Sequence, residues 1–167
     1  GTSGLESVGA VYAYQNTIHA IDDVGNDDDG VQCTNTPGYQ NHTYRNNVFS
    51  VGRYVITNEY CASTGTTYDY DLMYTKDTTR FVKWDGGVRY ASLSAFQTAT
   101  GQALHAINAL PVFEDLASGD LRLRPTSPGI DAGTVLVGFN DANSPWPSAG
   151  SRPDMGAFET SGPAPVN

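Results

Sequence analysis

A short motif of polar and aromatic residues occurs three times in this chain at nearly regular intervals. The copies are Tyr14–His19, Tyr44–Phe49 and Asp69–Tyr74, and each has Asn or Asp at its third position. Asn16 and Asn46 are 30 residues apart, and Asn46 and Asp71 are 25 apart. This period is typical of a coil whose successive turns stack on one another. The repeat therefore predicts about three stacked coils.

The rest of the sequence favours short strands and turns. The 167 residues are 39% apolar and include 18 Gly, 9 Pro and 10 Tyr, a mix that suits strands interrupted by many turns. Enrichment in β-branched and aromatic residues predicts strands in four stretches, with a bend in the first stretch near Gln15 and Asn16. These stretches are residues 8–21, 31–34, 54–61 and 81–84.

A single helix is expected near residues 92–100. Ser92 or Ser94 is a suitable N-cap, and Gly101 follows the last turn. Leu93 and Phe96 are three residues apart and would share the buried face of the helix. The predicted fold class is all-β with one short helix.

Strand alternation assigns a direction to the repeated side chains. If Ile18, Val48 and Met73 point into the coil, the residue after each of them points outward. Flat outward side chains stacked along a coil form a candidate carbohydrate-binding strip, although they could instead pack beneath neighbouring loops. The strip would contain His19, Phe49, Tyr74, Tyr14 and Tyr44.

The third position of each motif copy is predicted to be structural. Asn16, Asn46 and Asp71 would lie at the bend, where short polar side chains bond to unpaired backbone groups.

Charge excludes several classes of partner. The net charge is −9 and the chain has only two lysines, whereas nucleic acids and anionic membranes require clustered cations. No apolar run is long enough to span a membrane. The chain starts at Gly1 without a signal-like segment, so we expect a processed or excised product.

The first coil has nothing before it on which to stack. Its strand, residues 8–14, would expose an apolar face and an unpaired edge. We expect a second chain, or a preceding part of the same protein, to cover it.

Cys33 and Cys61 are 28 residues apart, close to the repeat interval. They would lie on neighbouring coils about 4.8 Å apart, a separation that a disulfide accepts. A bridge, and hence an oxidising extracytoplasmic setting, is predicted. The alternative is two unrelated buried thiols.

The C-terminal third carries a family resemblance. Its residues include Ser92-Leu93-Ser94-Ala95-Phe96-Gln97, Pro125-x-Ser127-Pro128-Gly129-Ile130-Asp131-Ala132-Gly133 and Arg152-Pro153-Asp154-Met155-Gly156-Ala157-Phe158-Glu159. Together these motifs resemble the C-terminal end of secreted right-handed parallel β-helix proteins of the pectate-lyase-like superfamily. The resemblance implies β-helix coils over residues 1–113, an irregular C-terminal cap over 114–160 and a linker-like tail over 161–167.

The resemblance also implies a class of function. Family members bind or process polysaccharides outside the cell, as lyases or glycosidases, and many have no assigned activity. We therefore expect a secreted polysaccharide-binding or polysaccharide-processing segment. The alternative is a non-catalytic subunit of a surface assembly or filament that stacks through its open N-terminal coil.

Candidate catalytic residues follow from those chemistries. A lyase would use a basic residue, and Lys76, Arg80 and Lys83 lie close together in sequence, although a solvated turn is the better explanation for them. A glycosidase would need two carboxylates about 5 to 9.5 Å apart. Asp69 with Asp71 is the candidate pair, although Asp71 is also expected to take the structural role of the repeated Asn.

No cofactor is required by these expectations, but Ca²⁺ is a candidate ligand. Its oxygen ligands would come from the acidic loop, which lacks the spacing of an EF-hand and can also be read as a solvated loop. The loop contains Asp22, Asp23, Asp27, Asp28 and Asp29.

Overall fold

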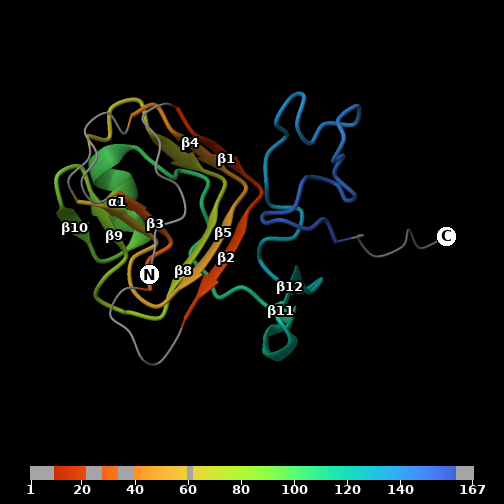
Figure 1. The fold of residues 1–167 in the computed structure, drawn as a ribbon, viewed down its shortest axis with the longest axis horizontal. Coiled ribbons are helices and arrows are strands. Elements are labelled where there is room, and N and C mark those ends of the chain that lie inside the picture. The colour runs from red at the N-terminus through yellow and green to blue at the C-terminus, as the bar shows by residue number, and fades with distance from the viewer. Residues whose placement is uncertain (1–9, 22–27, 34–39, 60–61, 161–167) are drawn as a thin grey trace.

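The computed structural model describes residues 10–21, 28–33, 40–59 and 62–160. These residues form three sheets of stacked strands, one α-helix and a C-terminal segment beside the sheets (Figure 1). The expected all-β class with one short helix is confirmed.

Each of the three sheets takes one strand from each of three successive parts of the chain. The first sheet contains β1 (Tyr12–Tyr14), β4 (Thr43–Arg45) and β7 (Thr67–Asp69). The second contains β2 (Thr17–Ala20), β5 (Val48–Val51) and β8 (Leu72–Thr75). The third contains β3 (Val31–Cys33), β6 (Ile56–Asn58) and β9 (Val82–Trp84).

All these strands pair in parallel with their counterparts. β10 (Val88–Tyr90) adds to the third sheet antiparallel to β9. We call the successive sets β1–β2–β3, β4–β5–β6 and β7–β8–β9 the first, second and third levels.

A sharp bend joins the first sheet to the second at every level. Gln15, Asn46 and Tyr70 lie at these bends with φ values of 51°, 58° and 56°. Few side chains tolerate this left-handed backbone, and Asn is among those that do. We call these three residues the bend column.

The main core lies between the three sheets. Tyr44 and Tyr68 come from the first sheet, Phe49 and Met73 from the second, and other buried residues from the third. Helix α1 (Leu93–Thr100) closes one end of this core through Phe96, whose ring meets Trp84 at 5.4 Å. As expected, the Ser92 side chain caps α1, and Gly101 follows it at φ 69°.

The C-terminal segment packs along the side of the second sheet and not over the end of the stack (Figure 1). A second core joins Val48 and Leu72 of that sheet to Phe113, Leu123 and Met155. The segment begins with the hairpin of β11 (Phe113–Asp115) and β12 (Asp120–Leu123), which are antiparallel and flank the 3₁₀ turn η1 (Leu116–Ser118). The end of the stack beside the third level is covered by α1.

The predicted register of the second sheet is right for Ile18 and Met73 but wrong by one residue at the second level, where Val48 was expected. Ile18 aligns with Phe49 and Met73, and Thr17 aligns with Val48 and Leu72. Because strand side chains alternate, this shift turns Phe49 into the main core and Val48 toward the C-terminal segment.

Candidate functional site

The outer face of the first sheet carries a row of polar and aromatic side chains. Ala13, Tyr44 and Tyr68 occupy the middle of their strands and pack into the main core, so the residues on either side face outward. Tyr14, Arg45 and Asp69 are aligned across the three strands. His105 continues the line, because its backbone N–H and its ring both bond to Asp69. We call Tyr14, Arg45, Asp69 and His105 the outer row.

Asp69 and His105 form an oriented acid–imidazole pair. His105 Nδ1 lies 2.8 Å from Asp69 Oδ2, and the His105 backbone N–H donates to Asp69 Oδ1 at 2.7 Å. The imidazole stacks on Tyr70, with ring centroids 4.5 Å apart and an interplanar angle of 7°. An ionised carboxylate only accepts hydrogen bonds, so in the neutral imidazole Nδ1 carries the proton and the lone pair lies on Nε2.

Two arginines flank this pair without a carboxylate partner among the described residues. The Arg45 guanidinium donates to neutral acceptors, the carbonyls of Tyr44 and Thr67 and the Thr67 hydroxyl, at 2.6 to 3.1 Å. The Arg152 guanidinium lies 5.7 Å from the centroid of the Tyr70 ring. By contrast, five other cations are ion-paired: Arg53, Arg80, Lys83, Arg122 and Arg124.

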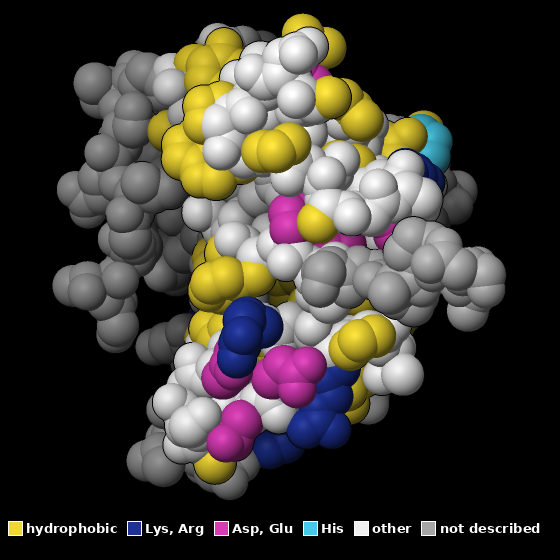
Figure 2. All heavy atoms as spheres, turned by 90° about the vertical axis from the view of Figure 1, so that its right-hand side faces the viewer, with side chains coloured by type: hydrophobic (Ala, Val, Ile, Leu, Met, Phe, Trp, Pro, Cys, Tyr) yellow, Lys and Arg dark blue, Asp and Glu magenta, His cyan; other side chains and the backbone are white. Residues whose placement is uncertain are grey.

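An aromatic cluster extends the row onto the C-terminal segment. Tyr14 contacts Tyr12 at a centroid distance of 6.1 Å and Phe139 at 5.4 Å, and Phe139 contacts Trp146 at 5.7 Å. Tyr12 is 66% exposed and Trp146 63% exposed. We call Tyr12, Tyr14, Phe139 and Trp146 the aromatic platform. Hydrophobic side chains gather in the upper part of the face in Figure 2, and charged ones toward the lower end.

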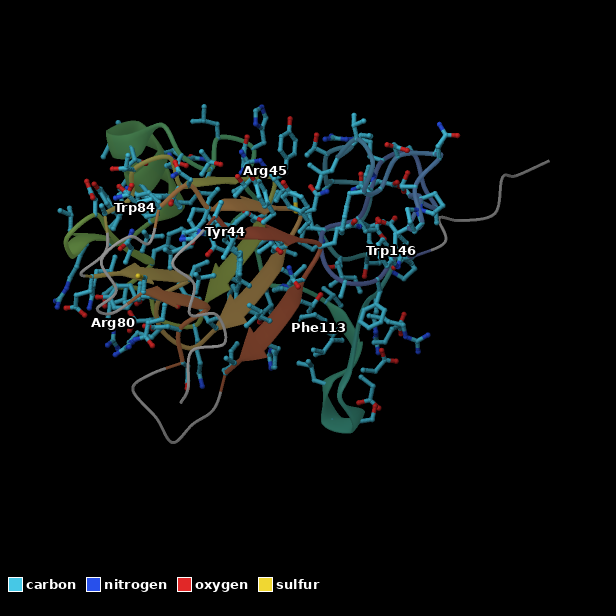
Figure 3. All side chains as sticks on the ribbon, turned by 45° about the horizontal axis from the view of Figure 1, so that its top comes forward. Tyr44, Arg45, Arg80, Trp84, Phe113 and Trp146 are labelled. Carbon is cyan, nitrogen blue, oxygen red and sulfur yellow. The ribbon has the colours of Figure 1, made fainter. Side chains whose placement is uncertain are left out.

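The bend column holds the C-terminal segment against this face. Gln15 Nε2 donates to Glu159 at 2.8 Å. The Asn46 amide exchanges two hydrogen bonds with the backbone of Thr134, at 2.7 and 2.8 Å. At the third level Tyr70 meets Arg152. All three bends therefore help to hold the C-terminal segment, which carries Arg152 and Trp146, against the first sheet. Figure 3 shows Trp146 on this segment.

A second polar column runs from the exposed Asn16 to the buried Asn47 and Asp71. The side-chain oxygen of Asn47 accepts from the backbone and side-chain N–H groups of Asn16, at 3.0 and 2.9 Å. Asp71 Oδ1 accepts the same pair of bonds from Asn47, both at 2.8 Å. The predicted structural role holds for Asn16 and Asp71, but Asn47 occupies the place expected for Asn46. We call Asn16, Asn47 and Asp71 the amide ladder.

Asp71 is the terminal member of the ladder. It has no exposed surface, and burial raises the pKa of its carboxyl to about 7. Its Oδ2 has no hydrogen-bond partner among the described residues. Asp71 is thus unavailable to a bound ligand, and the predicted carboxylate pair with Asp69 is wrong.

The residues of the predicted carbohydrate-binding strip do not lie together in the structure. Phe49 and Tyr44 are 1% and 2% exposed, and the Tyr44 ring stacks on Tyr68 at 4.2 Å, so their predicted outward orientation is wrong. His19 and Tyr74 lie half-buried on the second sheet. Nδ1 of His19 is 3.1 Å from Ser50 Oγ, and the His19 ring contacts the Phe113 ring. Only Tyr14 belongs to the outer row. Sugar binding by Tyr14, His19 and Tyr74 stays a prediction.

The predicted basic catalytic cluster does not form a shared groove. Arg80 pairs with Asp77, and Lys83 lies 3.1 Å from Glu59 with its ammonium over Tyr54. Lys76 is exposed. Arg80 lies on the far side of the molecule from Trp146 (Figure 3). Of the four predicted catalytic residues, only Asp69 reaches the outer row.

The acidic loop lies partly outside the described residues. Asp22, Asp23 and Asp27 are not described. Asp28 is half-buried. Asp29 binds the Arg53 guanidinium through both oxygens at 2.8 Å and also accepts from Tyr54 N and the Thr57 hydroxyl. These donors occupy the Asp29 carboxylate, and no group of three metal-ligating side chains is present in the described ranges. Calcium binding by the loop stays a prediction.

Cys33 is buried at the end of β3, but Cys61 lies outside the described residues. The predicted pairing of the two therefore stays a prediction. No helix in the described part of the chain is long and apolar enough to cross a membrane.

Sequence reasoning missed most of the site. Arg45, His105, Phe139, Trp146 and Arg152 were not predicted. A signal was available for Arg45, because it precedes the bend as Tyr14 and Asp69 do. Comparison with protein-family models, curated proteins and solved structures finds no match. The chemistry of the outer row is therefore what bears on function.

Proposed function

We propose that this chain is a right-handed parallel β-helix segment, of about three coils, that binds a linear polysaccharide along its outer row. Three parallel sheets in matched register support the coil. The motifs of residues 92–159 support membership of the pectate-lyase-like superfamily and a secreted location. A Cys33–Cys61 disulfide would fit an oxidising compartment.

The observation that carries this proposal is the continuity of the aromatic platform with the outer row. Rows of aligned residues cross a parallel sheet at right angles to its strands, with about 4.8 Å between neighbours. A row of four residues thus forms an extended track of about 14 Å. Exposed Tyr12 and Trp146 offer flat apolar faces at one end, and polar groups follow at the other. A linear sugar chain presents apolar C–H faces, which can stack on the aromatic side chains, and hydroxyl groups, which can bond to the polar ones.

The two arginines favour acidic sugars. Arg45 and Arg152 have no ion-pair partner among the described residues, although the chain as a whole carries a net charge of −9. Cations that are not neutralised by the protein can pair with a ligand carboxylate or sulfate. We expect affinity for acidic polymers to fall as salt increases, because partly exposed ion pairs are screened.

Binding can be tested by isothermal titration with polygalacturonate, alginate and the neutral polymer cellohexaose. Trp146→Ala should weaken binding of every ligand about tenfold, equivalent to about 1.4 kcal/mol. Arg152→Ala should weaken binding of the acidic polymers only. Leu116→Ala and Arg122→Ala are matched controls, because both side chains are exposed on the β11–β12 hairpin. Equal affinities for wild type and Trp146→Ala would refute the platform.

A second candidate function is supported by the first level. Ala13, Ile18, Ala20 and Val31 are only partly buried, whereas their counterparts in the second level are buried. This difference fits a non-catalytic subunit that stacks through its N-terminal end onto another chain. Electron microscopy separates the two candidates, because a filament or paired particle is visible without a sugar.

A further inference from the structure

The Asp69–His105 pair is more ordered than sugar binding alone requires. His105 has a side chain that is 56% exposed, yet its ring is fixed on one edge by Asp69 and on one face by Tyr70. The backbone N–H of His105 bonds to the second oxygen of the same carboxylate. An exposed imidazole would ordinarily sample several rotamers. Here its orientation is set by three contacts.

The free nitrogen of this imidazole is suited to proton transfer. Because Nδ1 donates to Asp69, Nε2 keeps its lone pair and no hydrogen bond occupies it among the described residues. A carboxylate that orients an imidazole and stabilises the imidazolium is a common way to prepare a general base. His105 and Arg45 both belong to the outer row, so a ligand bound along this row lies beside His105 Nε2.

The surrounding groups favour one class of reaction. Hydrolysis of a glycosidic bond needs two carboxylates, but Asp71 is sealed in the amide ladder and Asp69 is bonded to His105. Attack of water on an ester needs one general base beside the acyl carbon, a role that an oriented imidazole can fill.

We propose that His105, positioned by Asp69, is the general base that hydrolyses an ester, such as an O-acetyl group, on a saccharide bound along the outer row. This inference rests on the proposed polysaccharide-binding function. Water attacks the acyl carbon while Nε2 takes one of its protons, which gives a tetrahedral intermediate and an imidazolium. The bond from the acyl carbon to the sugar oxygen then breaks, and that oxygen takes the proton back from Nε2. The products are a sugar hydroxyl and a carboxylic acid.

The test measures acetate release from chemically O-acetylated polygalacturonate and alginate by the full chain. His105→Ala should lower kcat about 10²-fold or more, within the range typical of general-base catalysis. Added imidazole should restore part of the rate to His105→Ala, a response that loss of structure would not give. Asp69→Asn should lower kcat and leave KM nearly unchanged, because Asp69 acts through His105.

Asp120→Asn is the matched control for Asp69→Asn, since Asp120 is a carboxylate paired with Arg122 on the hairpin. It should leave the rate unchanged. Binding of the deacetylated polymers is measured in parallel. If the wild-type chain binds the polymers but releases acetate no faster than His105→Ala does, the esterase proposal is overturned and the binding proposal is not. Absence of binding to either polymer overturns the proposed function and this inference with it.

Discussion

Asp71 shows how one residue can make the whole fold depend on pH. Its Oδ1 accepts two hydrogen bonds from Asn47, while its Oδ2 is buried without a partner among the described residues. Burial raises the pKa of the carboxyl from 3.8 to about 7. The folded state therefore binds this proton more tightly than the unfolded chain does.

The sign of the pH effect follows from that difference. The contribution of Asp71 to stability is complete below about pH 4 and is lost as the pH rises to about 7. A shift of this size is linked to stability on the order of 4 kcal/mol. Asp71→Asn keeps the Oδ1 acceptor but cannot titrate, so its melting temperature should vary less between pH 4 and 7. Thermal melts of both proteins across this range provide the measurement.

Two other carboxyls change the stability with pH in the same direction as Asp71, because burial also raises the pKa of Asp154 and of Glu159. The informative quantity is therefore the difference between wild type and Asp71→Asn at each pH. A constant difference from pH 4 to 7 would contradict the assignment to Asp71.

Asn47 should be the most sensitive member of the amide ladder. It accepts from Asn16 on one side and donates to Asp71 and to the Ala13 carbonyl. Asn47→Ala leaves these buried groups unpaired and should cost about 2 to 4 kcal/mol, since each such group costs about 1 to 3 kcal/mol. Asn16→Ala is the comparison, because Asn16 is exposed at the end of the ladder. Urea denaturation that gives equal losses would contradict this ranking.

At the scale of elements, the bends connect the stacked strands to the C-terminal segment. Gly156 N donates to the Asn46 carbonyl at 2.6 Å. A Cβ at Gly156 would lie 2.7 Å from Thr17 Oγ1 and 3.0 Å from Val48 Cγ2. Only glycine allows the segment to approach the bend this closely.

Gly156→Ala should therefore loosen the C-terminal segment. Gly138→Ala is the matched control: both glycines have positive φ, at 105° and 78°, but a Cβ at Gly138 would meet nothing within 4 Å. We expect Gly156→Ala to cost about 1 to 3 kcal/mol more, the usual range for an overpacked site. Denaturant unfolding of the two variants measures the difference. If Gly156→Ala and Gly138→Ala lose the same stability, the positive φ of the two positions explains the loss, and close packing at Gly156 contributes nothing.

The elements themselves were largely predictable from sequence. The bend at Gln15 and Asn16, the start of β3 at Val31 and the capped helix α1 all follow from local residue preferences. The register was not predictable, because Asn46 and Asn47 are adjacent and the repeat could be aligned on either. Aligning Asn46 with Asn16 shifts the second level by one residue, and a one-residue shift reverses every side chain of a strand.

The outer row was hidden from sequence for a related reason. His105 and Arg152 are far from the motif copies in sequence, and only packing of residues 102–107 and of the C-terminal segment brings them to the first sheet. No local pattern encodes such contacts. Asp69 was found because it belongs to a motif copy, whereas its partner His105 does not.

At the scale of the whole molecule, the stack is less well buried at its N-terminal end. Ile18, Phe49 and Met73 occupy the same register position in the three levels. Phe49 and Met73 are buried, whereas Ile18 is only partly buried. Burial at one equivalent position thus increases away from the first level. A second chain stacked on the first level would remove this gradient.

Truncation at this position measures the gradient. Phe49→Ala should cost about 3 to 5 kcal/mol and Met73→Ala about 2 to 5. Ile18→Ala should cost less than either in an isolated chain, because the transfer term scales with the area buried. If another copy covers the first level, the cost at Ile18 should increase with protein concentration, since association adds to apparent stability. Denaturation at two protein concentrations, with sedimentation velocity on the same samples, distinguishes the cases. A monomer with no concentration dependence at Ile18 would contradict stacking of a second copy on the first level.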